Sequence, residues 1–150
     1  LNMFLLILFS SLTVYFDLKL LIIPLIIYFT ILSMNINFYS LQNEIWERDQ
    51  AYFEKSNLYK FGKYNLIEIA SVIENLDLVI SVDTSLLHLS CSLNKETWGI
   101  FNIYPDWRWG EFNKINPYQS LKMIKQKEFN KWDEVTDEIF RKLQIKFNLD

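Results

Sequence analysis

The pattern of hydrophobic and polar positions divides the chain near residue 43. Residues 1–43 carry only two charged side chains, Asp17 and Lys19, in an otherwise apolar or uncharged stretch. Beyond it, charged and apolar positions alternate as they do in a folded domain with a polar surface. The first part of the chain therefore needs a separate interpretation.

The apolar run LLIIPLIIYFTILSMNINF at residues 20–38 is close to the roughly 20 residues that a membrane-spanning helix requires. One interpretation is that residues 1–34 associate with a membrane as an anchor. The other is a buried helix that begins near Pro24, because the fixed φ of proline suits a first helical turn, followed by a strand at residues 35–41. The periodicity leaves both interpretations open.

Helical and strand patterns alternate from residue 65 onward. Asn65 and Glu68 have the spacing of a capping box, which predicts that a helix begins there. The apolar run at residues 78–82 is typical of a strand that is buried on both faces, and further strands are predicted at residues 97–103 and 121–126. The apolar positions expected to face the core are Leu66, Ile69, Ile73 and Leu76 in the first helix, and Trp132, Val135, Ile139, Leu143 and Phe147 in the last.

Strands that alternate with helices connect through right-handed crossovers and form a mostly parallel sheet. The sequence therefore predicts an α/β fold, with a Rossmann-like, mostly parallel sheet and flanking helices over residues 22–150. The apolar segment 1–21 is left unassigned. Ligands of such sheets bind beyond the carboxyl ends of the strands. Three positions meet this condition, namely Gln42, the segment Asp83–Ser85 and the loop 104–110.

Asp83, Thr84 and Ser85 stand where a predicted strand ends and a predicted helix begins. Unpaired N–H groups and the positive end of the helix dipole at such a junction bind anions such as a diphosphate. His88 lies one turn later, on the face that carries the two hydroxyl groups. The alternative is that Asp83 or Thr84 only caps the helix and that His88 is a partly buried side chain. The leucines of this helix expected to face the core are Leu86, Leu89 and Leu93.

The loop PDWRWG at residues 105–110 is the second candidate. Arg108 can bind two phosphate oxygens at once. Trp107 and Trp109 flank it and can stack on Arg108 or on a base or sugar ring. The alternative is a structural corner in which a cation–π contact holds Arg108. The sequence favours neither interpretation.

Composition narrows the classes of function. The net charge is −3 and the pI is about 5.2, so the chain lacks the basic surface that nucleic-acid binding requires. A single cysteine, Cys91, excludes an internal disulfide, and with a single histidine it argues against a structural zinc site. The three glycines cannot form a Walker or dinucleotide phosphate loop. No nucleophile elbow accompanies His88.

The order of these motifs resembles the C-terminal half of bacterial glycosyltransferases of the heptosyltransferase-like family 9, especially relatives that carry tetratricopeptide repeats. The resemblance covers about residues 22–148 and favours core over membrane for residues 22–38. It is carried by NINFYSLQ (35–42), NLIEIASVIENLDL (65–78), LDLVISVDTSLLHLSCSLNKETWGIF (76–101), PDWRWG (105–110), NPYQSLKMIKQ (116–126) and KWDEV (131–135).

This resemblance implies the donor-binding half of an enzyme in which two Rossmann-like domains face a cleft. The domain would bind a nucleoside-diphosphate sugar, whose sugar is then transferred with inversion to an acceptor, without a metal or other cofactor. The residues matched to donor binding are Gln42, Asp83, Thr84, Ser85 and His88, with Arg108 as a further contact. No catalytic residue can be assigned, because the acceptor-binding N-terminal domain with the catalytic base has no counterpart in this sequence.

The resemblance therefore implies a truncated chain that has little activity alone, unless an N-terminal domain or a partner chain supplies the missing half. A cytoplasmic location is expected, with membrane association through residues 1–34 as the open question. The alternative function is a membrane-anchored, non-catalytic α/β module that mediates protein contacts.

The sequence departs from the family pattern in three places. A stretch that resembles AGALGKP in the family is SCSLNKE at residues 90–96, which lacks the glycines and the proline. This departure puts tight packing between helix and strand in doubt. The family's SPWYPS is shortened to NPYQS at residues 116–120, and its RQ is Lys125 and Gln126.

Overall fold

A single sheet of six strands organises the chain in a computed structural model, which describes residues 4–8, 36–41, 50, 54, 59–60, 62–109, 117–129 and 131–148. Its strand order is β3-β2-β1-β4-β5-β6, and every ladder between these strands is parallel. The strands are β1 Phe4–Leu8, β2 Asn37–Ser40, β3 Tyr59–Lys60, β4 Leu78–Val82, β5 Thr97–Phe101 and β6 Leu121–Lys125.

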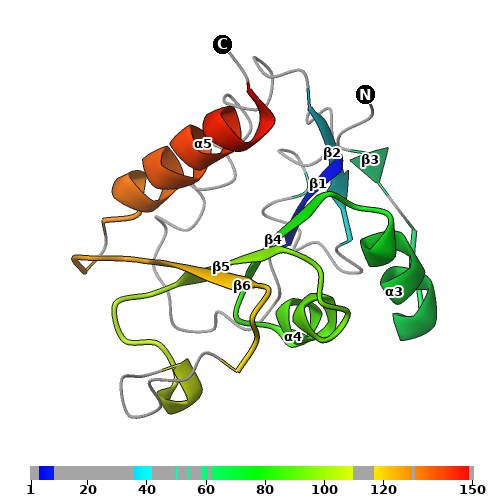
Figure 1. Cartoon of the computed structure of the whole chain (residues 1–150), viewed down its shortest axis with the longest axis horizontal. Helices are drawn as coiled ribbons and strands as arrows, with labels where there is room; N and C mark the ends of the chain where they lie inside the picture. The colour runs from blue at the N-terminus through cyan, green and yellow to red at the C-terminus, as the bar shows by residue number, and fades with distance from the viewer. Residues whose placement is uncertain are drawn as a thin grey trace.

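This strand order is that of the Rossmann fold, in which the direction of winding reverses between β1 and β4. Helices α3 Leu66–Glu74 and α4 Ser85–Ser92 lie on one face of the sheet, and α5 Asp133–Phe147 lies on the other (Figure 1). The predicted α/β class and the mostly parallel sheet are thereby confirmed. The reversal point matters for function because ligands of this fold bind there, at the carboxyl edge.

Strand β1 comes from the apolar segment that the sequence left unassigned. Phe4–Leu8 forms the centre of the sheet, where it pairs with β2 on one side and β4 on the other. A short, wholly apolar run suits a central parallel strand, but periodicity cannot distinguish such a strand from a helix. Residues 9–35, which hold the helix predicted near Pro24 and most of the proposed anchor, lie outside the described residues. Among the described residues, no helix is long and apolar enough to cross a membrane.

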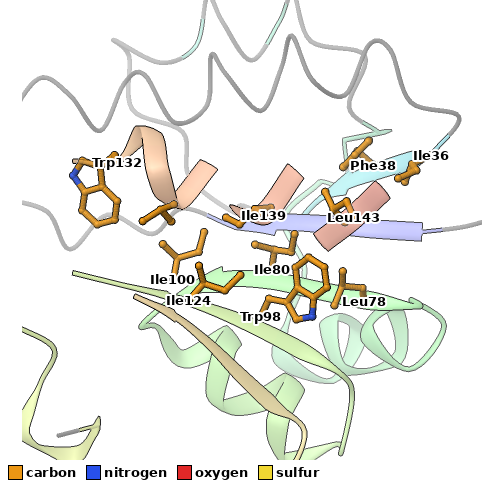
Figure 2. Close-up of a cluster of buried hydrophobic side chains, with 11 residues drawn as sticks. Ile36, Phe38, Leu78, Ile80, Trp98, Ile100, Ile124, Trp132, Ile139 and Leu143 are labelled. Atoms are coloured by element: carbon orange, nitrogen blue, oxygen red, sulfur yellow. The ribbon is translucent and has the colours of Figure 1, made fainter. Parts of the chain in front are cut away.

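The core beneath α5 consists of apolar side chains from four strands of the sheet, which pack against one face of the helix. Figure 2 shows Ile80, Ile100 and Ile124 of the sheet facing Ile139 and Leu143 of α5. Trp132, Val135, Ile139 and Leu143 are buried as their spacing predicted, and Phe147 is partly buried against the same cluster. The helical period of α5 therefore determines which of its faces meets the sheet.

Helix α3 begins as the sequence predicted. Asn65 accepts hydrogen bonds from the N–H groups of Ile67 and Glu68, and the Glu68 carboxylate accepts one from the N–H of Asn65. The predicted apolar stripe is right for Ile69, Ile73 and Leu76 but wrong for Leu66, which is 59% exposed. Leu66 is the first residue of the helix, and no part of the described structure covers it there.

Helix α4 packs the predicted leucines against the core and buries a second set of residues more completely. Leu87, Ser90 and Cys91 lie against the sheet and are buried, whereas Leu86, Leu89 and Leu93 are partly buried and pack on the cluster beneath α3. The sequence pattern assumed a single apolar face. The helix instead contacts two neighbours, since α3 lies beside it and the sheet lies below it.

The SCSLNKE departure is accommodated without glycine. Asn94, at the position that is glycine in AGALGKP, has a φ of 54°, a left-handed conformation that asparagine tolerates better than most residues. Thr97 Oγ1 donates a 2.9 Å hydrogen bond to the buried Ser90 Oγ, which in turn donates to Leu87 O. The Lys95 ammonium donates to two carbonyl groups at the end of α3. Polar contacts thus hold helix and strand together where the family uses small residues.

Glu96, which replaces the family's proline, gathers three donors at the amino edge of the sheet. The Lys122 ammonium lies 2.8 Å from Glu96 Oε1, and the Lys146 ammonium lies 2.8 Å from Glu96 Oε2. The Trp98 indole N–H donates a 3.0 Å hydrogen bond to Oε1. Partial burial alone would raise the pKa of Glu96, but these hydrogen bonds outweigh it and lower the pKa to about 2. Glu96 therefore joins β5, β6 and α5.

The depressed pKa makes this link pH-dependent. Above pH 4.5, the ordinary pKa of glutamate, the ionised Glu96 contributes its full stabilisation, which is lost as pH falls toward the folded-state value of about 2. We expect Glu96→Gln to lower the free energy of unfolding by about 1 kcal/mol at pH 7 and to match the wild type near pH 2. Urea denaturation across this range measures the difference. Glu138→Gln, which removes a surface ion pair with Lys142, is the control and should change little at any pH. A constant difference between pH 7 and pH 2 would contradict this account.

Gly99 in β5 has no room for a side chain. A Cβ atom there would lie 2.6 Å from the Phe101 ring and 2.9 Å from a methyl group of Leu87 and of Leu121. We expect Gly99→Ala to reduce the free energy of unfolding by about 1–3 kcal/mol, because three buried side chains must move together. Gly62→Ala is the matched control, since nothing lies within 4 Å of its Cβ position. Equal unfolding midpoints for the two variants would show that this packing is not tight.

Candidate functional site

The candidate site lies at the carboxyl end of β4, where the winding of the sheet reverses. Strand β4 ends at Val82 and α4 begins at Ser85, so Asp83 and Thr84 form the junction. A β-branched strand that leads directly into a helix places the first turn of that helix at the carboxyl edge. All strands that flank the junction are parallel, so their loops meet at the same edge.

Thr84 occupies the N-cap position of α4, but its side chain forms no cap hydrogen bond, so the alternative of simple capping does not hold for Thr84. Its hydroxyl lies 3.2 Å from Ser81 Oγ instead. Its carbonyl accepts the first hydrogen bond of the helix, from the His88 N–H at 3.3 Å. The N–H groups in the first turn of α4 therefore receive no capping from Thr84, and they lie at the positive end of the helix dipole.

Asp83 connects the junction to the loop after β5. The Trp109 indole N–H donates a 2.8 Å hydrogen bond to Asp83 Oδ2. His88 Nε2 lies 3.7 Å from Asp83 Oδ1, and Arg108 Nη2 lies 3.9 Å from Asp83 Oδ2. The structure thus brings together Asp83, His88 and Arg108, three residues that the sequence predicted on one edge.

His88 is held on three sides and remains about one-third exposed. Its ring stacks on Trp109, with centroids 5.3 Å apart and an interplanar angle of 25°. His88 Nδ1 lies 3.0 Å from the Tyr118 hydroxyl. The sequence analysis did not single out Tyr118 as a site residue, although it lies within the NPYQS motif. The contact spans 30 residues, which only the fold brings together.

Arg108 is oriented by Asp106. Its side-chain Nε lies 2.8 Å from Asp106 Oδ1, which also accepts from the Arg108 backbone N–H at 3.0 Å. Hydrogen bonding and charge between the two groups raise the pKa of Arg108 and lower the pKa of Asp106. This ion pair with Asp106 holds Arg108, while half of the side chain remains exposed to solvent. Those exposed N–H groups are open to an anion.

The two tryptophans of the 105–110 loop have different environments. Trp109 is 8% exposed and packs against Phe101 at a centroid distance of 5.2 Å, whereas Trp107 is 75% exposed. Both belong to one 3-10 turn, Trp107–Trp109. Trp109 is therefore a buried side chain on which His88 stacks, and Trp107 is the exposed tryptophan that can stack on a bound ring.

Gln42, the remaining predicted site residue, lies outside the described residues. Over the part of the chain that the structure describes, no group of three or more His, Cys, Asp or Glu side chains is placed to hold a metal ion. The described site is made of backbone N–H groups, Asp83, His88, Arg108 and the aromatic side chains around them.

A parallel sheet of this order, with an open helix start at its reversal point, defines a Rossmann-like α/β domain. The family model for glycosyltransferase family 9 (heptosyltransferase) matches residues 37–139, so the chain belongs to this family. The match includes every described residue of the candidate site, from Asp83 to Tyr118.

A solved structure, "E. coli heptosyltransferase WaaC with ADP-2-deoxy-2-fluoro heptose", is similar in fold, with a TM-score of 0.66. The sequence identity is 16%, and the alignment covers 97% of this chain and 44% of the WaaC chain. The chain therefore spans less than half the length of that enzyme. No curated protein matches the chain.

The hydrogen bond between Trp109 and Asp83 can be tested by a double-mutant cycle. We expect Asp83→Ala and Trp109→Phe to couple by about 1 kcal/mol in the free energy of unfolding, because either change alone removes the same hydrogen bond. The coupling separates this bond from the cavity that Trp109→Phe leaves. Asp83→Ala combined with Trp107→Phe is the control cycle and should show no coupling, since Trp107 is exposed. A coupling near zero in the first cycle would remove this bond from the description of the site.

Proposed function

We propose that this domain binds the nucleoside-diphosphate sugar of a glycosyltransferase reaction and holds the diphosphate at the start of α4. The observation that carries the proposal is the junction at Thr84, where the first turn of an eight-residue helix lacks a side-chain cap at the reversal point of a Rossmann sheet. Membership of a glycosyltransferase family indicates the class of ligand.

The phosphate oxygens would accept hydrogen bonds from the backbone N–H groups in the first turn of α4. Thr84 and Ser85 have small side chains, which allow a ligand to approach the backbone closely. Arg108, half exposed and already oriented by Asp106, supplies positive charge from the facing loop. His88 adds an N–H donor one turn into the helix.

Asp83 has a different part in this proposal from the one the family resemblance implies. A carboxylate repels a diphosphate, and this one already accepts a hydrogen bond from Trp109 and faces His88 and Arg108. We therefore assign it to positioning these three side chains. Its negative charge also keeps Arg108 near the junction before a ligand binds.

Charge stabilisation at this site would assist sugar transfer. When an acceptor hydroxyl attacks the anomeric carbon, the bond from that carbon to the diphosphate oxygen breaks and its electron pair remains on the diphosphate. The dipole of α4 and the Arg108 guanidinium stabilise that developing charge. The acceptor proton passes to a base outside the described site. The proposal places that base and the acceptor in a second domain or chain, and it invokes no metal.

Binding can be measured by calorimetry on the 150-residue chain with ADP, UDP, GDP and their sugars. The ligand in the similar WaaC structure makes ADP-linked sugars the first to test. We expect weak binding of one nucleotide, unchanged by EDTA, and a roughly tenfold loss of affinity in Arg108→Ala. Arg141→Ala, an exposed arginine on α5, is the matched control and should bind as the wild type does.

A second variant separates binding from stability. Ser85→Asp places a negative charge in the first turn of α4, which stabilises the helix but repels a diphosphate. We expect the melting temperature to hold or rise while nucleotide affinity falls at least tenfold. No heat with any nucleotide, or full binding by Ser85→Asp, would overturn the proposal.

A further inference from the structure

The geometry around His88 determines which of its ring nitrogens carries hydrogen. On one side, Nε2 lies 3.7 Å from the Asp83 carboxylate, which can only accept a hydrogen bond. On the other side, Nδ1 lies 3.0 Å from the Tyr118 hydroxyl, which can donate. A neutral imidazole has one N–H and one lone pair. With hydrogen on Nε2, the ring directs an N–H toward the carboxylate and a lone pair toward the Tyr118 hydroxyl, which then donates.

The opposite tautomer is unfavourable at this position. It would direct the lone pair of Nε2 toward the carboxylate oxygen of Asp83. Stacking on Trp109, whose indole is itself bonded to Asp83, holds the plane of the ring, and a half-turn within that plane would take Nδ1 away from the Tyr118 hydroxyl. The Tyr118 ring also meets the edge of His88, with centroids 5.7 Å apart at an angle of 64°. The orientation of His88 is therefore determined from three separate segments of the chain.

We propose that Tyr118 is a positioning residue of this site: its hydroxyl donates to His88 Nδ1 and, with the Asp83 carboxylate facing Nε2, holds neutral His88 as the Nε2–H tautomer, which directs a hydrogen-bond donor toward the start of α4. The part that concerns a ligand rests on the proposed function, whereas the tautomer itself does not. His88 then donates to a phosphate oxygen without first gaining a proton. Tyr118 acts through His88 and needs no contact with the ligand.

The ring nitrogens of His88 can be observed directly, because it is the only histidine of the chain. A chain labelled with ¹⁵N-histidine gives one pair of ring nitrogen signals, recorded above the pH at which the ring is protonated. We expect Nε2 to carry the hydrogen, and the Nδ1 signal to have the shift of a nitrogen that accepts a hydrogen bond. Tyr118→Phe keeps the aromatic ring but removes the hydroxyl, so the Nδ1 signal should move to that of a free lone pair.

Nucleotide affinity provides the second readout. With the nucleotide that the wild-type chain binds, Tyr118→Phe should weaken affinity about 3- to 10-fold, the effect of one hydrogen bond. It should have no effect in a His88→Ala background, because Tyr118 acts through that ring. Tyr59→Phe, an exposed tyrosine on β3, is the matched control and should change neither readout.

The outcomes distinguish this inference from the proposed function. A wild-type Nδ1 that carries the hydrogen, or an Nδ1 signal unchanged by Tyr118→Phe, overturns the inference even if a nucleotide binds. An equal loss of affinity from Tyr118→Phe with and without His88 also overturns it. The expected nitrogen signals without any nucleotide binding would support the tautomer and contradict the proposed function alone.

Discussion

The Trp109 indole N–H donates a 2.8 Å hydrogen bond to the Asp83 carboxylate, and the arrangement of the carboxyl edge depends on this contact. It joins the end of β4 to the loop after β5. His88 stacks on the same indole, and Arg108 directly precedes Trp109 in the same turn, so both are placed relative to the start of α4. This bond therefore helps to hold the side chains of His88 and Arg108 at the junction.

The two edges of the sheet differ in how completely their polar groups are satisfied. At the amino edge, the Glu96 carboxylate has donors from Lys122, Lys146 and Trp98, and it stabilises the packing of α5. At the carboxyl edge, the N–H groups in the first turn of α4 lack a side-chain cap, and Arg108 is half exposed. The ionic contacts of Glu96 therefore lie at the edge opposite the site, and the polar groups left open at the carboxyl edge are those that a ligand can satisfy.

The chain preserves the fold of its family with different local solutions. Asn94 adopts the left-handed turn that glycine would adopt, and the buried Ser90 hydroxyl bonds to Thr97 between α4 and β5. Glu96, which stands where the family has a proline, forms ion pairs with Lys122 and Lys146. The doubt that the departure raised about helix-to-strand packing is answered by these contacts, which replace small residues with hydrogen bonds.

The sequence by itself determined the strand at 78–82, the strand predicted at 121–126 to within one residue, the capping box of α3, and the edge of the sheet on which Asp83, His88 and Arg108 lie. Each follows from periodicity or from the parallel topology, which are local or general rules. The prediction was wrong for Leu66 and incomplete for α4, whose residues against the sheet it missed, because burial depends on which neighbouring elements reach each side chain. The tertiary structure alone decided that Phe4–Leu8 is the central strand, that Trp109 is buried while Trp107 is exposed, and that Tyr118 meets His88. These contacts join residues far apart in the chain, and no local pattern records which distant partner will satisfy a ring nitrogen or a carboxylate.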